Sequence, residues 1–210
     1  TDIIESEDRT EPLSLTGSVI RNPPQTTTIA SLQTEMQEAA LAAVHHLTSL
    51  QREDGWIPGI VDPMHRGNPY AVSWPRLTFV AWALSEWGAA SHSKEALSSS
   101  EKLIAYCKYA TKTLSLSTQE KALCAAYLGK AAQALGDERL VEQQQSILLQ
   151  QIPSLTFEPI SYGQAASFLL YSGNSVAREA GMGLFQKMLQ TFLKERESGE
   201  ILSLASYAEL

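Results

Sequence analysis

Residues 117–148, STQEKALCAAYLGKAAQALGDERLVEQQQSIL, predict two helices joined by a tight turn. Ser117 is followed three residues later by Glu120, which is the spacing of a capping box at a helix N-terminus. Gly136 suits the left-handed residue that closes a helix, and Asp137 suits the N-cap of the next one. Apolar residues recur at spacings of three and four on both sides of this turn. The segment is therefore expected to form an antiparallel helix pair, and this pair is the expected unit of the fold.

The same helical spacing of apolar residues continues from Ser31 to the end of the chain. Further helices are expected over residues 31–53, over 74–87 with Gly88 as the stop, after a second capping box of Ser98 and Glu101, over 162–171, from Asn174 or Ser175 to about Leu193, and over 200–210. No stretch shows the sustained period-two alternation of a β-strand. We expect an all-α fold of paired antiparallel helices in an α/α-toroid-like or open solenoid-like array.

Residues 1–30 differ from the rest of the chain. They are rich in acidic side chains, contain Pro23-Pro24 and the run Thr26-Thr27-Thr28, and show no regular apolar spacing. Such a composition is typical of an unstructured segment. We expect a flexible acidic N-terminal arm over residues 1–30 and a helical domain over residues 31–210. This domain suits part of a larger toroid, because a closed ring needs more helices than are expected here.

The overall composition is that of a globular protein. Of its 210 residues 44% are hydrophobic, and 16 basic against 23 acidic side chains give a net charge of −7. This balance argues against nucleic acid as a partner, because such a surface needs clustered basic side chains. No apolar run approaches the roughly 20 residues that span a bilayer. The first residues lack a basic and apolar leader, so a cytoplasmic protein is expected.

The sequence offers no metal or cofactor motif. Cys107 and Cys124 lie in apolar helical stretches and are expected to be small buried residues. His45 and His46 are neighbours on a helix, so their side chains diverge by about 100° and do not suit a shared metal ion. Metal-ligand spacings, a phosphate-binding glycine loop and a nucleophile elbow are all absent. We therefore predict neither a metal nor a cofactor.

The segment His46–Trp56, HLTSLQREDGW, resembles the helix-ending motif of the squalene cyclase and prenyltransferase superfamily. Leu47, Gln51, Gly55 and Trp56 match that motif. The resemblance implies an α/α-toroid fold and a structural role for these four residues. Gln51 would close the helix end through hydrogen bonds, and Trp56 would stack against it.

The match to this motif is incomplete. His46 replaces an aromatic residue, and Trp56 directly follows Gly55 where the superfamily usually has one residue between them. A degraded second copy has its elements at Phe192, Leu193, Glu197, Gly199 and Ile201. The catalytic motifs of the superfamily are missing, because the chain has no Asp-x-Asp-Asp run and no Asp-rich magnesium motif, and its Cys and His residues assemble no recognisable zinc site.

A long irregular stretch between residues 53 and 76 collects most of the remaining chemistry. Its candidate binding residues are Trp56, His65, Tyr70, Trp74 and Arg76, and its weak catalytic candidates are the carboxylates of Asp62 and Glu53. Carboxylates beside aromatic rings suit a sugar-binding or glycoside-cleaving groove. The alternative is that the aromatic side chains pack and the charged ones are solvated. Long loops carry function more often than other segments, which keeps the first interpretation open.

Three functions follow from these observations. The preferred one is a non-catalytic helical module that acts as a scaffold or in protein interaction, with a protein partner or a larger parent chain. The alternative is a terpene-cyclase-like toroid enzyme, or a remnant of one, that binds an apolar isoprenoid. The second alternative is a carbohydrate-active toroid domain. Without a catalytic motif, whether the chain is an enzyme stays open. An exposed apolar patch would favour partner binding, and a polar groove with facing carboxylates would favour a sugar.

Overall fold

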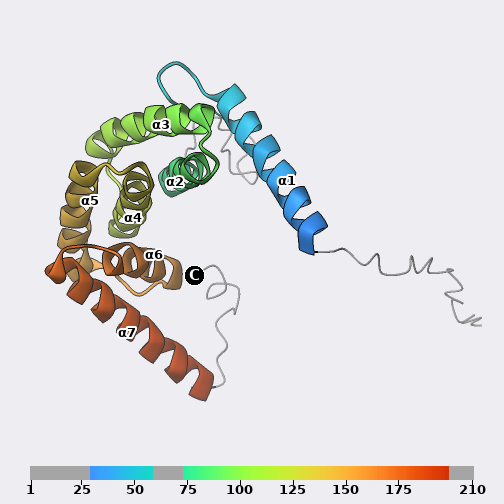
Figure 1. Ribbon diagram of the computed structural model, residues 1–210. Coiled ribbons are helices and arrows are strands. Elements are labelled where there is room, and N and C mark those ends of the chain that lie inside the picture. The colour runs from blue at the N-terminus through green and yellow to red at the C-terminus, as the bar shows by residue number, and fades with distance from the viewer. Residues whose placement is uncertain (1–28, 59–72, 199–210) are drawn as a thin grey trace, which may run out of the picture. The chain divides into compact units, whose positions relative to one another are not determined.

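The computed structural model describes residues 29–58 and 73–198, and all of its regular elements are helices (Figure 1). They are α1 (Ile29–Leu50), α2 (Trp74–Ser91), α3 (Lys94–Thr113), α4 (Thr118–Leu135), α5 (Glu138–Gln151), the 3-10 turn η1 (Ile152–Ser154), α6 (Pro159–Leu170) and α7 (Ser175–Ser198). These two ranges contain no strand, so the expected all-α class is confirmed.

The chain divides by its internal contacts into two units, Thr1–Ala39 and Ala40–Leu210. Of the first unit the structure describes Ile29–Ala39, which are helical throughout. The expected arm, residues 1–30, lies almost wholly outside the described residues, and so does the helix expected over 200–210. The architecture that follows is that of the second unit.

Six helices of the second unit form two layers. The core layer consists of α2, α4 and α6, which pack side by side in that order. The outer layer consists of α3, α5 and α7, each of which packs on the core helix that precedes it in the chain (Figure 1). Short turns join the partners, such as Gly136-Asp137 between α4 and α5. The described part of this unit is thus three successive helix pairs.

The sequences of the helices explain which layer each one joins. The core-layer helices α4 and α6 are buried around much of their circumference, and in α6 the six residues 161–166 are all buried. Outer-layer helices bury one side only, as in α5, where the buried residues are Leu140, Gln144, Gln145 and Leu148. A one-sided pattern of this kind places a helix at the surface, whereas all-round burial requires neighbours on several sides.

Close contacts between the helices depend on glycine, both within the core layer and between the two layers. A Cβ atom built on Gly129 of α4 would lie 2.1 Å from the Phe168 ring of α6. In the same way, a Cβ atom on Gly88 would lie 2.8 Å from the side chain of Leu97. Gly88 was expected to stop its helix, and this is wrong. The helix continues to Ser91, because Gly88 serves the close approach of α2 and α3, and His92 takes the left-handed closing position.

The turn between α4 and α5 forms as the sequence predicts. Ser117 and Glu120 make the reciprocal hydrogen bonds of a capping box. Gly136 closes α4 with φ 71°, and the Asp137 carboxylate accepts a hydrogen bond from the backbone N–H of Leu140 at 3.0 Å. Each residue of this turn therefore takes the role that its type favours.

The capping box expected at Ser98 and Glu101 is wrong. The helix begins earlier, at Lys94, and its N-cap is Ser93, whose side chain accepts from the N–H of Ala96. Ser100 is instead buried where α3 meets α2, and its hydroxyl donates to the carbonyl of Ala81 at 3.0 Å. A run of serines is typical of a helix N-terminus, but small side chains suit a close contact between two helices equally well.

The two cysteines behave as small buried residues. Cys107 and Cys124 are free and buried. Burial raises the pKa of each thiol to about 12, with Cys124 adding to the effect on Cys107. No helix among the described residues is long and apolar enough to cross a bilayer.

Candidate functional site

The end of α1 is fastened to α3 by Gln51. Its side-chain amide donates to the carbonyl of Gly55 at 3.0 Å and to the carbonyl of Ser99 at 2.9 Å. Gly55 has φ 92°, and a Cβ atom there would lie 2.3 Å from the carbonyl oxygen of Lys102. Any other residue at Gly55 would therefore push α1 away from α3. We call Gln51, Gly55, the Ser99 carbonyl that Gln51 binds and the Lys102 carbonyl against which Gly55 packs the helix-end clamp.

Trp56 and its neighbours complete this region. The guanidinium of Arg52 lies 4.5 Å from the centroid of the Trp56 ring. The Arg52 N–H donates to the Trp56 carbonyl at 2.8 Å, and the Trp56 N–H donates to the Asp54 carboxylate at 3.0 Å. Trp56 is partly buried against the hydrophobic core, to which the half-buried Leu47 also belongs. These contacts fit the structural role that the motif implies, while membership of the superfamily stays a prediction.

The expected site between residues 53 and 76 is described only at its two ends. Asp62, His65 and Tyr70 lie outside the described residues. Trp74 stacks on Tyr106 of α3 with ring centroids 6.0 Å apart. Burial raises the pKa of Tyr106, helped by the charge of Asp54. The catalytic candidate Glu53 and the binding candidate Arg76 are both exposed.

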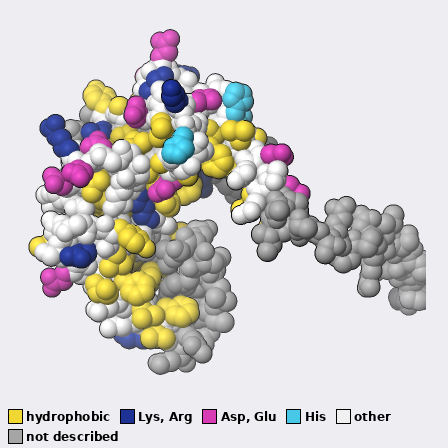
Figure 2. All heavy atoms as spheres, viewed as in Figure 1, with side chains coloured by type: hydrophobic (Ala, Val, Ile, Leu, Met, Phe, Trp, Pro, Cys, Tyr) yellow, Lys and Arg dark blue, Asp and Glu magenta, His cyan; other side chains and the backbone are white. Residues whose placement is uncertain are grey.

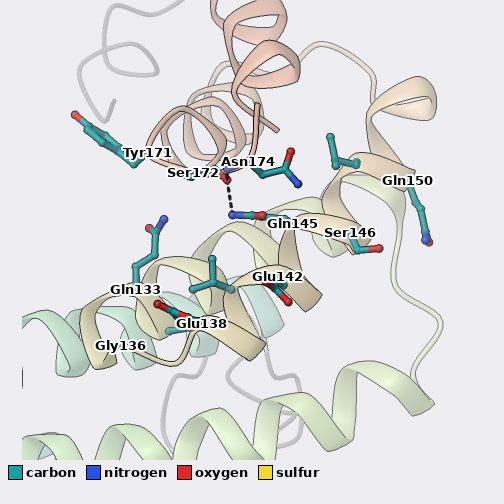
Figure 3. A pocket seen from close by; sticks show the side chains of 14 residues that line it. Gln133, Gly136, Glu138, Glu142, Gln145, Ser146, Gln150, Tyr171, Ser172 and Asn174 are labelled. Atoms are coloured by element: carbon teal, nitrogen blue, oxygen red, sulfur yellow. Dashed lines mark hydrogen bonds between the residues drawn. The ribbon is translucent and has the colours of Figure 1, made fainter. Parts of the chain in front are cut away.

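A polar groove lies elsewhere, between α5 and the turn that joins α6 to α7 (Figure 3). Its volume is about 1020 Å³. The amide of Gln145 on α5 donates to the hydroxyl of Ser172 on the turn at 2.8 Å, and this bond ties the two walls together. Ser172 in turn accepts from the N–H of Asn174, whose side chain caps the first turn of α7 through Val176. One hydrogen bond therefore joins the two walls of the groove, and the turn itself is held by local hydrogen bonds.

The groove is lined by uncharged polar groups and apolar groups in similar measure, together with two charged side chains. Carboxamides and hydroxyls come from α4, α5 and the turn, and the labelled polar side chains are Gln133, Gln145, Ser146, Gln150, Tyr171, Ser172 and Asn174 (Figure 3). The only charged side chains among the described lining residues are Glu138 and Glu142. They are four residues apart on α5 and so share one face of that helix. The groove is thus acidic, and its walls can both donate and accept hydrogen bonds.

These groove residues were missed by the sequence analysis. The glutamine run at 143–145 suggests an exposed helix face, but Gln144 and Gln145 are 4% and 6% exposed. The burial of Gln144 could have been predicted, because Leu140, Gln144 and Leu148 recur at a spacing of four and so share one helix face. A buried amide needs a hydrogen-bond partner, which would have pointed to a contact with another element. The partner of Gln145 is 27 residues away, and no local pattern specifies that distance.

A third surface is an apolar stripe on α7. It consists of Met182, Phe185, Leu189 and Leu193, which recur at spacings of three and four and are exposed. Figure 2 shows hydrophobic side chains gathered over this helix. Exposed apolar stripes of this kind are typical of surfaces that contact another polypeptide.

No group of three or more metal-binding side chains occurs in the part of the chain that the structure describes. His45 pairs instead with Glu95, with 3.7 Å between the ring nitrogen and the carboxylate oxygen. In comparisons with known proteins, no family model, no curated protein and no solved structure matches the chain. The function must therefore be argued from the geometry alone.

Proposed function

We propose that this chain is a non-catalytic helical interaction module, and that its groove binds an extended, basic segment of a partner protein. The observation that carries the proposal is the groove between α5 and the α6–α7 turn, with its carboxamide walls and two glutamates. Its volume, about 1020 Å³, lies at the upper end of the range for ligand sites and suits several residues of an extended peptide.

The carboxamides suit a peptide backbone. A peptide presents N–H donors and C=O acceptors in alternation, and each Gln or Asn side chain offers one of each kind. Gln133, Gln150 and Asn174 line the groove from three different elements, so they can meet an extended chain at several points (Figure 3). The Asn174 oxygen already accepts from the N–H groups of α7, so Asn174 offers its NH₂ donors. Recognition through the main chain fits a module that binds a segment of a partner.

The two glutamates set the charge of the partner. Glu138 and Glu142 lie on one face of α5, and the described lining contains no Lys, Arg or His to neutralise them. A basic side chain in the bound segment would supply the missing counter-charge. Complementary charge contributes mainly to specificity and to the association rate, so this pair should select among peptides.

The apolar stripe on α7 adds support for an interaction role. Partner binding is the usual reason for exposing several large apolar side chains on one helix. Met182, Phe185 and Leu189 belong to this stripe and not to the groove lining. A partner that enters the groove at the α6–α7 turn could continue along α7.

A carbohydrate is the second candidate, favoured by Tyr171. Its side chain is 84% exposed at the rim of the groove, beside carboxamides that suit sugar hydroxyls. An exposed ring of this kind can stack on the apolar face of a pyranose. The isoprenoid alternative receives less support from this groove, because the lining carries two glutamates and several carboxamides.

The test is a binding screen with the full chain. Basic, neutral and acidic peptide libraries and an oligosaccharide array are compared, and affinities are then measured for wild type, Glu142→Gln and Tyr171→Ala. We expect basic peptides to bind, and Glu142→Gln to weaken them about tenfold, which corresponds to roughly 1.4 kcal/mol. Glu179→Gln is the matched control, because Glu179 is exposed on α7 outside the groove. Selective binding of oligosaccharides, or equal loss in the control, contradicts the proposal.

A further inference from the structure

A cluster of aromatic rings lies beside one lysine in the core layer. Phe79 and Trp82 of α2 and Tyr127 of α4 contact one another, with ring centroids 5.4 to 5.9 Å apart. The ammonium group of Lys130 lies 4.6 Å from the centroid of the Trp82 ring. The same ammonium donates a hydrogen bond to the side-chain carbonyl of Gln164 on α6. We call these five residues the aromatic–lysine cluster, and all three core-layer helices contribute to it.

Lys130 is partly desolvated by burial, and no close counter-ion among the described residues compensates for this. In the described part of the chain no carboxylate lies within ion-pair distance of Lys130. The carboxylate of Glu86 acts on it from further away and is itself engaged by the indole N–H of Trp82 at 2.9 Å. Burial lowers the pKa of Lys130 to about 8, although Glu86 works in the opposite direction. A bound anion would supply the missing counter-charge.

Apolar surface lies next to this charge. Phe79 is 45% exposed although it belongs to a core-layer helix, and its ring meets both Trp82 and Tyr127 edge-on. Aromatic rings attract other planar groups through offset or edge-to-face packing. The cluster thus offers one cation and an accessible aromatic surface side by side.

We propose that the aromatic–lysine cluster is a second binding site, which takes a carboxylate carried on a planar apolar body. The carboxylate would accept a hydrogen bond from Lys130, and the planar body would pack against Phe79. A single lysine suits a singly charged head group, and Gln164 holds the ammonium in place. This site shares no residue with the groove and stands independently of the function proposed for it.

The matched control is the other lysine that lies against an aromatic ring. Lys187 is 5.4 Å from the centroid of Tyr162 and donates to its hydroxyl at 3.1 Å, but it is exposed, and its ring partner Tyr162 is buried against Phe157. Lys130→Met and Lys187→Met therefore remove the same charge and the same type of ring contact from the two layers.

The experiment titrates the full chain with 2-naphthoate and with the uncharged 2-naphthalenemethanol, followed by tryptophan fluorescence and calorimetry. We expect saturable binding of 2-naphthoate, at least tenfold weaker in Lys130→Met, largely retained in Lys130→Arg and unchanged in Lys187→Met. The uncharged probe should bind wild type and Lys130→Met alike. Absence of saturable binding at millimolar 2-naphthoate, or equal binding by folded Lys130→Met, overturns the proposal.

Discussion

The two layers of helices differ in how much change they tolerate. In the core layer, α4 meets α6 through Gly129 and the Phe168 ring, and no space for a methyl group remains. In the outer layer, α7 carries Gly183, beside which a Cβ atom would have no neighbour within 4 Å. The proposed groove lies mainly on the outer helix α5 and on a turn. Stability should therefore depend on the core layer, and most groove residues should be replaceable without unfolding the protein.

The largest expected effect is that of Gly129→Ala. The added methyl group would overlap the ring of Phe168, so one of the two core helices must shift. Overpacking of a tight core typically costs about 1–3 kcal/mol. Chemical denaturation of the variant should show a loss of at least this size. Unchanged stability would mean that α4 and α6 do not approach as closely as described.

Gln51→Ala tests the helix-end clamp and should have the next largest effect. The substitution removes hydrogen bonds to the carbonyls of Gly55 and Ser99 and separates α1 from α3. Loss of partly buried hydrogen bonds costs on the order of 1–2 kcal/mol. The expected result is a lower melting temperature, with faster hydrogen exchange confined to the end of α1 and the start of α3. Uniform exchange changes across all helices would contradict a local clamp.

The third prediction is that the pH dependence of stability comes from a lysine of the core layer, Lys130, and not from Lys187 of the outer layer. The pKa of Lys130 falls from 10.5 to about 8 on folding, so the unfolded chain binds more protons between these values. The free energy of unfolding should therefore rise from pH 8 to 9. The thiols of Cys107 and Cys124, with pKa raised from 9.0 to about 12, act in the opposite direction from about pH 8 upward and reduce the net rise, because the unfolded chain loses their protons first.

The measurement is urea unfolding at closely spaced pH values between 8 and 9. Wild type and the outer-layer control Lys187→Met should both become more stable with pH, whereas Lys130→Met should lose this rise. An identical pH profile in all three proteins would show that Lys130 is not desolvated by folding.

The smallest expected effect is a gain in stability, produced by Gly183→Ala. Gly183 lies within α7 and has open space around it, so Gly183→Ala should stabilise the helix by about 0.5–1 kcal/mol. Thermal unfolding checks the sign. A destabilised Gly183→Ala would indicate that this face of α7 is covered in solution, and it would break the contrast with Gly129.

The sequence predicts the helices better than it predicts the site. Ser117, Gly136 and Asp137 carry local signals, because capping depends on residues within one turn of each other. The patterns at Gly88 and at serines 98–100 predict the wrong helix ends, since a glycine or a serine suits either a helix end or a close contact between helices. Gly88 instead contacts Leu97, and Ser100 contacts the carbonyl of Ala81, and both contacts exist only in the folded chain.

The groove shows most clearly what a sequence pattern does not predict, namely which distant residues meet in the fold. The sequence favours a site between residues 53 and 76, where acids and aromatic residues are close along the chain. The groove instead joins α5 to residues 171–174, and its hydrogen bond between Gln145 and Ser172 spans two helices. The aromatic–lysine cluster is similar, because Trp82, Lys130 and Gln164 come from three separate helices. Single-sequence patterns carry no information on such pairings.

The most direct test of the proposed function is the salt dependence of peptide binding. A basic peptide selected in the screen is titrated calorimetrically into wild type and into the double variant Glu138→Gln/Glu142→Gln at several salt concentrations. The account predicts that salt weakens binding to wild type, and that the double variant binds at least tenfold more weakly with little further dependence on salt. Equal affinity and equal salt dependence in the two folded proteins would contradict the groove as the binding site.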